Sequence, residues 1–247
     1  MNLLVQKYGG SILQSPEFIK KVAEHIVETK KKYPNLVVVV SAMKGTTDEL
    51  SNMAKAISAN PNRRELDMLL TAGERITMAL LAIALHEMGC PARSLTGSQS
   101  GIVTDEAHTG AQILEVKADR IKEALQNGEV AVVAGFQGVS RHREVTTLGR
   151  GGSDITAVAI AGTLGAERCE LYKDVDGIYE GDPKKIVQPK RLKFCTYEDA
   201  EKMAKEGAKI IHPSAVSLAR TYKVPISLLS LDKSEGGTFI ADKESRV

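Results

Sequence analysis

The sequence of 247 residues contains no tryptophan, few other aromatic residues and three cysteines. Cys90, Cys169 and Cys195 are widely separated and form no CxxC pair, which argues against a disulfide framework and against a cysteine-based zinc site. None of the histidines occurs in HExxH or another metal-ligand spacing, so we expect no metal centre built by the protein alone. This cysteine usage is typical of a reducing, cytoplasmic setting.

The sequence also lacks a strong charge of one sign and a long hydrophobic run. Its formal net charge is +2, which is not the basic footprint of a nucleic-acid-binding protein, so we expect no nucleic-acid partner. The start MNLLVQKYGG lacks the charged region and the apolar stretch of a secretory signal, and we expect no membrane span.

Short apolar runs rich in β-branched residues alternate with longer amphipathic stretches, which predicts an α/β fold with a largely parallel sheet covered by helices. The segments 97–116 and 136–147 predict hairpins at the sheet edge or over a site. The helical patterns begin at Pro16, TDEL, RREL and ITAV, and we expect Gly73 to interrupt the third and Gly89 to close it. We expect strands at NLLVQKY, Leu36–Met43, Ala92–Leu95, Val130–Ala134, Glu170–Tyr172 and Ile226–Leu229.

The segment KYGGS, Lys7 to Ser11, follows the first expected strand and precedes a helix. Gly9 and Gly10 allow backbone N–H groups to approach an anion closely, and Lys7 adds a positive charge suited to phosphate. The segment is not a Walker A motif, and an ordinary turn with a surface lysine remains the alternative.

The segment SAMKGTTDEL begins at the carboxyl end of the strand Leu36–Met43, where ligands of open α/β sheets bind. Its hydroxyl groups, among them those of Ser41 and Thr47, either contact a ligand or cap the following helix. The residues alone favour the cap.

The segment LLTAGERITMALLA places Glu74 and Arg75 in an otherwise apolar helix, so we expect one of these charges to face inward. A buried carboxylate needs a cationic or strongly hydrogen-bonding partner. Glu74 is then either a ligand for an ammonium group or one half of an internal ion pair with Arg75 or another basic residue.

The segment TTLGRGGSDITAVAIAG combines a glycine-rich turn with charges of both signs at the start of a helix. Ser153 and Asp154 are suitable caps, while Gly151 and Gly152 expose the first N–H groups of the helix, which attract anions. Arg150 suits a carboxylate or phosphate, and Asp154 suits a role in orienting a group or holding a cation. The segment therefore predicts transfer chemistry between two anionic partners.

The loop YKDVDGIYEGDPK, from Tyr172 to Lys184, follows an expected strand. Its glycines and proline suit a turn, but a turn does not explain its concentration of acidic, basic and aromatic side chains.

Taken together, KYGGS, SAMKGTTDEL, LLTAGER, LTGSQSG, VAGFQGV, TTLGRGGSD, DVDGIY with DP, and GAKIIHP resemble the catalytic domain of aspartate kinases, in the amino acid kinase superfamily. The resemblance extends over almost the whole chain and keeps the order of the motifs. It implies a single domain, residues 1–247, folded as a three-layer αβα sandwich around a mainly parallel central sheet. Within it, roughly residues 1–150 would bind the acceptor and 151–247 the nucleotide.

The resemblance also implies a reaction. ATP, bound with Mg²⁺ and without a P-loop, would transfer its γ-phosphoryl group to the side-chain carboxylate of L-aspartate. The product, 4-phospho-L-aspartate, would enter lysine, threonine and methionine synthesis. The family further implies a cytoplasmic homodimer.

The family's site residues carry over to matching positions of this sequence. Lys7 and Asp154 would be catalytic, Glu74 would take the ammonium group of aspartate, and Arg150 with Ser153 would take a carboxylate. The full acceptor set is Ser41, Thr47, Glu74, Arg150, Gly151, Gly152 and Ser153. The nucleotide set is Lys7, Gly9, Gly10, Ser11, Lys173, Asp174, Tyr179, Asp182, Pro183, Lys184 and Lys209.

The sequence departs from the family pattern at Ile12, where a second hydroxylic residue is common, and at Lys184, where arginine is common. The regulatory ACT domains of the family have no counterpart in this sequence, so we expect no feedback inhibition by lysine or threonine within it. The alternatives are a kinase of the same fold acting on acetylglutamate or a nucleoside monophosphate, and a non-catalytic ligand sensor. Glu74 with GRGGSD argues against the first, and Lys7 with Asp154 argues against the second.

Overall fold

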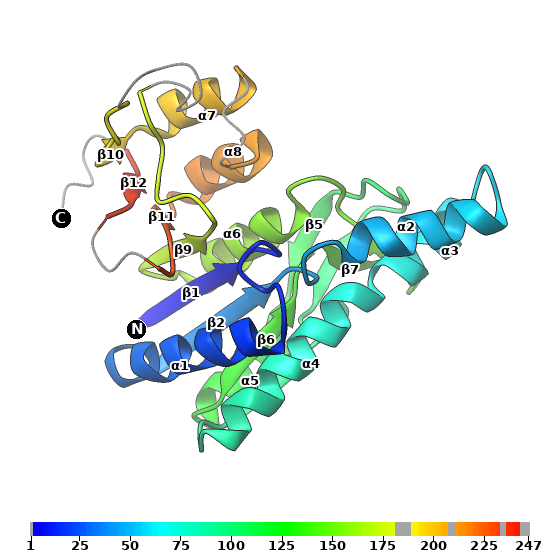
Figure 1. Ribbon diagram of the computed structural model, residues 1–247, viewed down its shortest axis with the longest axis horizontal. Helices are drawn as coiled ribbons and strands as arrows, with labels where there is room; N and C mark the ends of the chain where they lie inside the picture. Colours follow the sequence, from blue (N-terminus) through cyan, green and yellow to red (C-terminus); the bar gives the residue numbers. More distant parts are fainter. Residues whose placement is uncertain (1, 181–188, 207–210, 233–235, 243–247) are drawn as a thin grey trace.

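The structure is a computed structural model that describes residues 2–180, 189–206, 211–232 and 236–242 (Figure 1). Four residues that the resemblance assigns to the nucleotide lie outside these ranges: Asp182, Pro183, Lys184 and Lys209. Their assignment stays a prediction.

An eight-stranded sheet with the order β10-β12-β11-β9-β1-β2-β6-β3 forms the centre of the fold. Neighbouring strands in it are parallel except for β11 and β12, which confirms the predicted mainly parallel sheet. Every residue of β1 is buried, as is usual for a strand covered on both faces. The strands are β1 (Leu3–Tyr8), β2 (Asn35–Val40), β3 (Ala92–Leu95), β6 (Val130–Ala134), β9 (Arg168–Tyr172), β10 (Phe194–Cys195), β11 (Ile226–Leu229) and β12 (Thr238–Ile240).

Helices cover both faces of this sheet (Figure 1). On one face, α1 (Pro16–Lys32) and α4 (Ala72–Glu87) pack against Leu4 and Val38. On the other, α5 (Asp119–Gln126), α6 (Gly152–Leu164), α7 (Tyr197–Lys205) and α8 (Pro213–Tyr222) belong to the core that contains Val5 and Val37. Successive strand residues thus point to opposite layers. The arrangement confirms the predicted αβα sandwich.

Four short strands form a second sheet with the order β5-β4-β7-β8. Its members are β4 (Ile102–Thr104), β5 (Ile113–Val116), β7 (Gln137–Ser140) and β8 (Val145–Thr147). The pairs β4/β5 and β7/β8 are antiparallel, as the predicted hairpins require, and the parallel pair β4/β7 joins them. That union of distant segments was not predicted.

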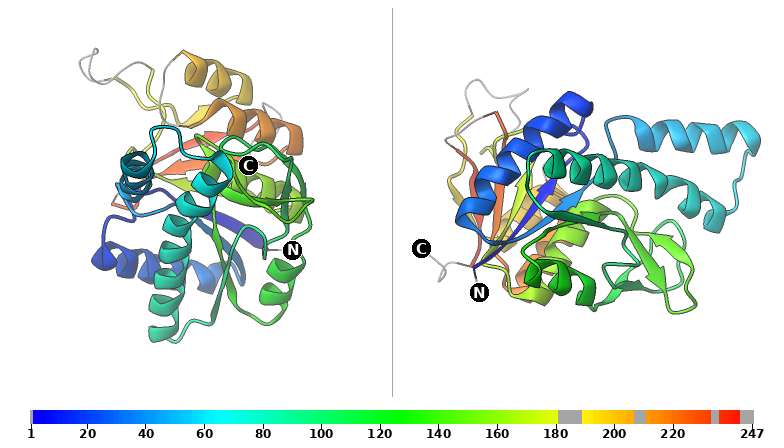
Figure 2. Two further views of the ribbon diagram at one scale, coloured as in Figure 1. Left: turned by 90° about the vertical axis from the view of Figure 1, so that its right-hand side faces the viewer. Right: turned by 90° about the horizontal axis from the view of Figure 1, so that it is seen from below.

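Helices α2 (Thr46–Ile57) and α3 (Arg63–Leu70) extend from the sandwich as an arm, and α2 contains no buried residue (Figure 2). The expectation that Gly73 interrupts the helix is wrong, because α3 ends at Leu70 and Gly73 lies in the first turn of α4. A Cβ atom on Gly73 would lie 2.8 Å from the Cβ atom of Ala42, so close packing requires the glycine. Gly89, with φ +71°, follows the end of α4.

One helical stretch, Arg63–Glu87, has a mean hydropathy of 1.6 in an 18-residue window and is long and apolar enough to cross a membrane by those measures alone. This match rests on length and composition only and does not overturn the expectation that the sequence contains no membrane span. Half of the window is buried inside the molecule, and α4 packs against α1, β3 and β6, as a core helix does.

Candidate active site

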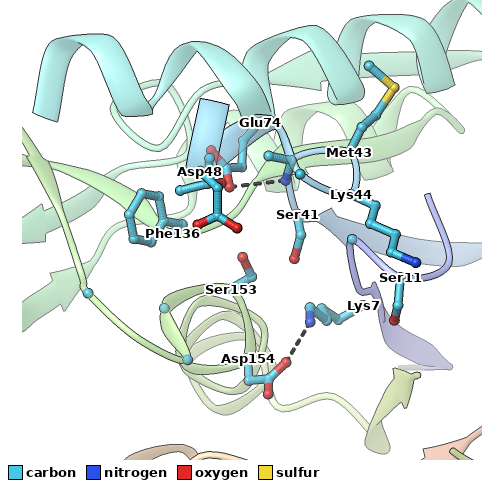
Figure 3. Close-up of a pocket in the computed structure, with 17 residues that line it drawn as sticks. Lys7, Ser11, Ser41, Met43, Lys44, Asp48, Glu74, Phe136, Ser153 and Asp154 are labelled. Atoms are coloured by element: carbon cyan, nitrogen blue, oxygen red, sulfur yellow. Dashed lines mark hydrogen bonds and ion pairs between the residues drawn. The ribbon is translucent and has the colours of Figure 1, made fainter. Parts of the chain in front are cut away.

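A cavity of about 420 Å³ opens at the carboxyl ends of β1 and β2, between the start of α6 and the start of α4 (Figure 3). This is the edge at which open parallel α/β sheets bind ligands. Its lining residues come from segments far apart in the sequence: Lys7, Gly10, Ser11, Ser41, Ala42, Met43, Lys44, Gly45, Thr47, Asp48, Glu74, Phe136, Gly149, Gly151, Gly152, Ser153 and Asp154.

A charge cluster of Lys7, Asp154 and Lys173 lies at one end of the cavity, where Lys7 and Asp154 line the wall and Lys173 packs behind them. Lys7 Nζ lies 2.8 Å from Asp154 Oδ1, and Lys173 Nζ donates to Asp154 Oδ2 at 2.7 Å. Lys7 is a residue of β1 and Lys173 directly follows β9. The two lysines lie close together because β1 and β9 pair in parallel and end side by side. Asp154 lies in the first turn of α6, so the cluster joins three elements.

The cluster keeps Asp154 ionised. Burial alone would raise the pKa of this carboxyl, but the charges of Lys7 and Lys173 outweigh burial and lower the pKa to about 2. Burial lowers the pKa of Lys173, and the charge of Asp154 opposes that change. With two cations and one anion, the cluster has an excess positive charge at neutral pH, which suits a phosphate.

The start of α6 presents backbone N–H groups to the cavity. Gly149 and Gly151 have φ of +72° and +75°, and this left-handed turn leads directly into the helix. Gly151 is the N-cap and α6 begins at Gly152 without a side-chain cap, so the expectation that Ser153 and Asp154 cap it is wrong. Both residues lie in the first turn instead and line the cavity, where the helix end favours an anion.

Glu74 forms the opposite part of the cavity wall (Figure 3). Its side chain is buried, and Oε1 accepts the backbone N–H of Ala42 at 3.0 Å. Oε2 is also buried and has no hydrogen-bond partner within the described ranges, and no ion pair with Arg75 occurs there. Burial raises the pKa of Glu74 to about 7, although the Ala42 N–H and the charge of Lys7 act in the opposite direction. Among the described residues, Glu74 therefore has no ion-pair partner.

The loop after β1 packs tightly on the loop after β2. A Cβ atom on Gly10 would lie 2.8 Å from the carbonyl oxygen of Ala42, so this position tolerates no side chain. The N–H of Gly9 donates to the carbonyl of Tyr172 at 3.2 Å, which ties the loop to the end of β9. Gly9 itself does not line the cavity.

The structure brings ten of the predicted site residues together around the cavity: Lys7, Gly10, Ser11, Ser41, Thr47, Glu74, Gly151, Gly152, Ser153 and Asp154. Arg150 is exposed and does not line it, although its neighbours Gly149 and Gly151 do. Asp174 is exposed, and the hydroxyl group of Tyr179 donates to Asp176 at 2.7 Å in the loop after β9. The expectation that Thr47 caps α2 is wrong, since Gly45 is the N-cap.

Sequence reasoning missed several lining residues, among them Phe136, Met43, Lys44 and Asp48. Phe136 belongs to the quoted segment VAGFQGV and has φ of +68°, an uncommon conformation for a non-glycine residue. Lys44 and Asp48 belong to SAMKGTTDEL, and their place directly after a central strand was the available signal.

Comparisons with known proteins place this geometry in a family. The sequence profile described as the amino acid kinase family matches residues 2–230. An aspartokinase from Corynebacterium efficiens is 50% identical over 242 residues, which cover 98% of this chain and 58% of the relative. An aspartokinase from Geobacillus stearothermophilus is 46% identical over 245 residues, which cover 99% of this chain and 60% of the relative. The chain thus spans less than two thirds of the length of these curated relatives.

Solved structures agree with the sequence comparisons. The aspartate kinase from Synechocystis superposes with a TM-score of 0.88 at 46% identity, covering 99% of this chain and 41% of that one. E. coli aspartokinase III, solved in complex with aspartate and ADP, has a TM-score of 0.87 at 23% identity, covering 99% of this chain and 65% of that one, and supports the fold alone. From the profile, the fold and the relatives, this chain belongs to the amino acid kinase family.

Proposed function

We propose that this chain transfers the γ-phosphoryl group of ATP to the side-chain carboxylate of L-aspartate, giving 4-phospho-L-aspartate and ADP, the first step of lysine, threonine and methionine biosynthesis. One observation carries the proposal: a single cavity holds a net positive cluster around Asp154 and a buried carboxylate, Glu74, that lacks a cation. The similarity to aspartokinases at 46–50% identity supports it.

In this proposal Glu74 binds the ammonium group of L-aspartate, which supplies the missing cation. Arg150 and Ser153 bind a carboxylate next to Gly151 and Gly152, and the hydroxyl groups of Ser41 and Thr47 make the remaining polar contacts. Because Arg150 is exposed in the structure, its side chain has to turn over the bound acceptor. Each charge of the acceptor then has a complement.

The reaction needs no general base, because the nucleophile is a carboxylate that is already ionised at neutral pH. One of its oxygens forms a bond to the γ-phosphorus, the bond to the bridging oxygen breaks, and its electron pair stays on ADP. Lys7 and Lys173 stabilise the charge of the transferred group, while Asp154 holds both ammonium groups in place. An Asp154 carboxyl with a pKa of about 2 suits this role better than proton transfer.

Mg²⁺ would arrive with ATP as part of the substrate and neutralise charge on the phosphates. The described part of the chain contains no group of three or more acidic, histidine or cysteine side chains that could hold a metal ion. The phosphate oxygens would therefore hold Mg²⁺. The nucleotide would lie beside the loop after β9, against Lys173, Asp174 and Tyr179, with its phosphates near Gly9, Gly10 and Ser11. With Asp182, Pro183, Lys184 and Lys209, which lie outside the described residues, residues 151–247 would contribute most of its site and residues 1–150 most of the acceptor site.

The test is release of ADP from ATP and Mg²⁺, with and without L-aspartate, with hydroxylamine present to trap an acyl phosphate. We expect aspartate-dependent release and a hydroxamate product. A panel containing N-acetylglutamate, L-glutamate and uridine monophosphate identifies the acceptor. ADP release without any dependence on L-aspartate would contradict the proposal.

Lys7→Ala tests the role of the cluster. We expect a loss of phosphotransfer of at least about a hundredfold, the scale for removing a group that stabilises transition-state charge. Lys31→Ala, which removes an exposed lysine that pairs with Glu28 on α1, is the control and should retain activity. Unchanged phosphotransfer by Lys7→Ala would remove this lysine from the mechanism. The cytoplasmic location and the homodimer stay predictions, the latter measurable by sedimentation.

A further inference from the structure

Asp67, on α3, is a buried carboxylate outside the cavity that three neighbouring residues hold by hydrogen bonds. The hydroxyl group of Thr147 donates to Oδ1 at 2.6 Å, and the backbone N–H of Thr109 lies 3.1 Å from both carboxylate oxygens. His108 Nδ1 lies 2.7 Å from Oδ2. Asp67 is completely buried, so these contacts replace water. The cluster ties α3 to β8 and to the loop between β4 and β5.

Asp67 on α3 and Glu74 on α4 belong to one helical stretch, Arg63–Glu87, because Thr71 between the two helices keeps a helical backbone conformation. They are seven residues apart, close to two turns, so they share a face of the stretch and are separated by about 10 Å along its axis. Between them, the carbonyl of Thr71 accepts the side-chain amide of Gln137 from β7 at 3.1 Å. Asp67 on α3 and Thr71 at the junction of α3 and α4 thus fix this stretch to the second sheet just before Glu74.

Thr147, the partner of Asp67, ends β8 three residues before Arg150. Its carbonyl accepts the N–H of Ala111 at 2.8 Å, and the next N–H, of Leu148, donates to Phe136 at 2.9 Å. The chain then turns through Gly149 into α6. Because the Arg150 side chain is exposed, how far it reaches into the cavity depends on where this backbone is held.

We propose, on the basis of the proposed function, that Asp67 and Thr147 are positioning residues that set the distance between Glu74 and Arg150. The Asp67–Thr147 hydrogen bond connects α3, which leads through Thr71 into the helix that carries Glu74, to the strand that leads to Arg150. A fixed distance selects an acceptor of fixed length. The bond therefore favours L-aspartate over L-glutamate, which is longer by one methylene group.

A purely structural role for the cluster predicts a different result, and the chain offers a matched control. Thr146, the neighbour of Thr147 on β8, is equally buried and its hydroxyl group lies 2.7 Å from that of Thr104. Successive strand residues point to opposite faces, so Thr146→Val removes a buried hydrogen bond of similar length that does not involve Asp67. If β8 acts only through its stability, Thr146→Val and Thr147→Val should behave alike.

The experiment compares Thr147→Val, Thr147→Ser and Thr146→Val in the full chain, by steady-state kinetics with L-aspartate, L-glutamate and ATP. For Thr147→Val we expect the KM for L-aspartate to rise about tenfold, within the roughly hundredfold that a 1 Å misplacement costs. We expect an unchanged KM for ATP and a smaller preference for L-aspartate over L-glutamate. Thr147→Ser should restore wild-type values, and Thr146→Val should change the aspartate KM by less than about twofold.

Two results overturn the inference. One is an unchanged aspartate KM in folded Thr147→Val, and the other is an equal rise in Thr146→Val. If Thr147→Val does not fold, His108→Phe is the substitute, because it removes the more exposed donor to Asp67. It should also raise the aspartate KM. An unchanged aspartate KM in His108→Phe would overturn the inference. A wild-type chain without aspartate-dependent turnover would instead overturn the proposed function, and this inference with it.

Discussion

Glu74→Gln separates the cost of a buried carboxylate from its use in binding. The wild-type side chain is 3% exposed, and one of its oxygens has no partner among the residues that the structure describes. Glutamine has nearly the same shape and keeps a carbonyl oxygen that can accept the Ala42 N–H, but it carries no charge at any pH. We expect this variant to be more stable than the wild type at high pH and to bind L-aspartate less tightly.

The magnitude follows from the pKa. Burial raises the pKa of Glu74 from its ordinary value of 4.5 to about 7. Because the folded pKa is raised, the full stabilising contribution of the protonated carboxyl is present below about pH 4.5, and it is lost as pH rises through about 7. Linkage between these two values gives about 3 kcal/mol lost in total, most of it between pH 5 and pH 8.

The assay is urea unfolding of the wild type and of Glu74→Gln at several pH values from 5 to 8, without substrate. The free energy of unfolding of Glu74→Gln, relative to the wild type, should increase by roughly 2–3 kcal/mol over this range. Glu87→Gln, at the exposed end of the same helix, is the control and should show no such trend.

Binding should change in the opposite sense. In the proposed function L-aspartate needs the ionised form of Glu74, so the wild-type KM for aspartate should be about tenfold higher at pH 6 than at pH 8, in proportion to the ionised fraction. Glu74→Gln should have a higher KM throughout, without this pH dependence. If the difference in unfolding free energy stays constant from pH 5 to pH 8 and the wild-type KM is also flat, Glu74 is not a buried acid that titrates near neutrality, and the reasoning fails.

Two further substitutions test the opposite end of the cavity. Lys173→Met removes one of the two cations at Asp154, so we expect kcat to fall by at least about tenfold with little change in the aspartate KM, and an unchanged kcat would contradict the role of the cluster. Gly151→Ala puts a side chain in a left-handed turn, where its Cβ atom overlaps the Cβ atom of His212. The variant should lose activity. Its free energy of unfolding should fall by more than about 1–2 kcal/mol, the cost of the left-handed backbone alone. Gly165→Ala, at φ +62° with no neighbour within 4 Å at the other end of α6, should lose only the backbone cost and remain active.

Much of the fold could be predicted because its signals are local. The run that forms β2 is apolar on both faces, Pro16 starts α1, and Gly165 closes α6 in the left-handed conformation. The second sheet could not be predicted as a unit, since its formation depends on pairing between β4 and β7, which are distant in sequence. The strand β10, Phe194–Cys195, is too short for a periodic pattern.

The part of the site that lies at the ends of the central strands could be predicted from the sequence. Lys7 lies at the end of β1, and Ser41 directly follows the neighbouring strand β2. Both residues line the cavity. Lys173 was assigned to the nucleotide, whereas the structure shows its ammonium group on Asp154, a contact that depends on the register between β1 and β9. For Thr47 the residues alone favoured the wrong role, the cap, because a cap and a cavity role both need a hydroxyl group after a strand.

The two carboxylates of the cavity show why residue type alone leaves a role undecided. Asp154 and Glu74 are both almost fully buried, yet the first has a pKa of about 2 and the second of about 7. The difference comes from their neighbours, since Asp154 lies between two ammonium groups and Glu74 accepts one backbone N–H. Without substrate the cavity thus has surplus positive charge at one end and a carboxylate in need of a cation at the other. In the proposed function a phosphate of ATP corrects the first imbalance and the ammonium group of L-aspartate corrects the second, so the two ends of the cavity favour different groups of the two substrates.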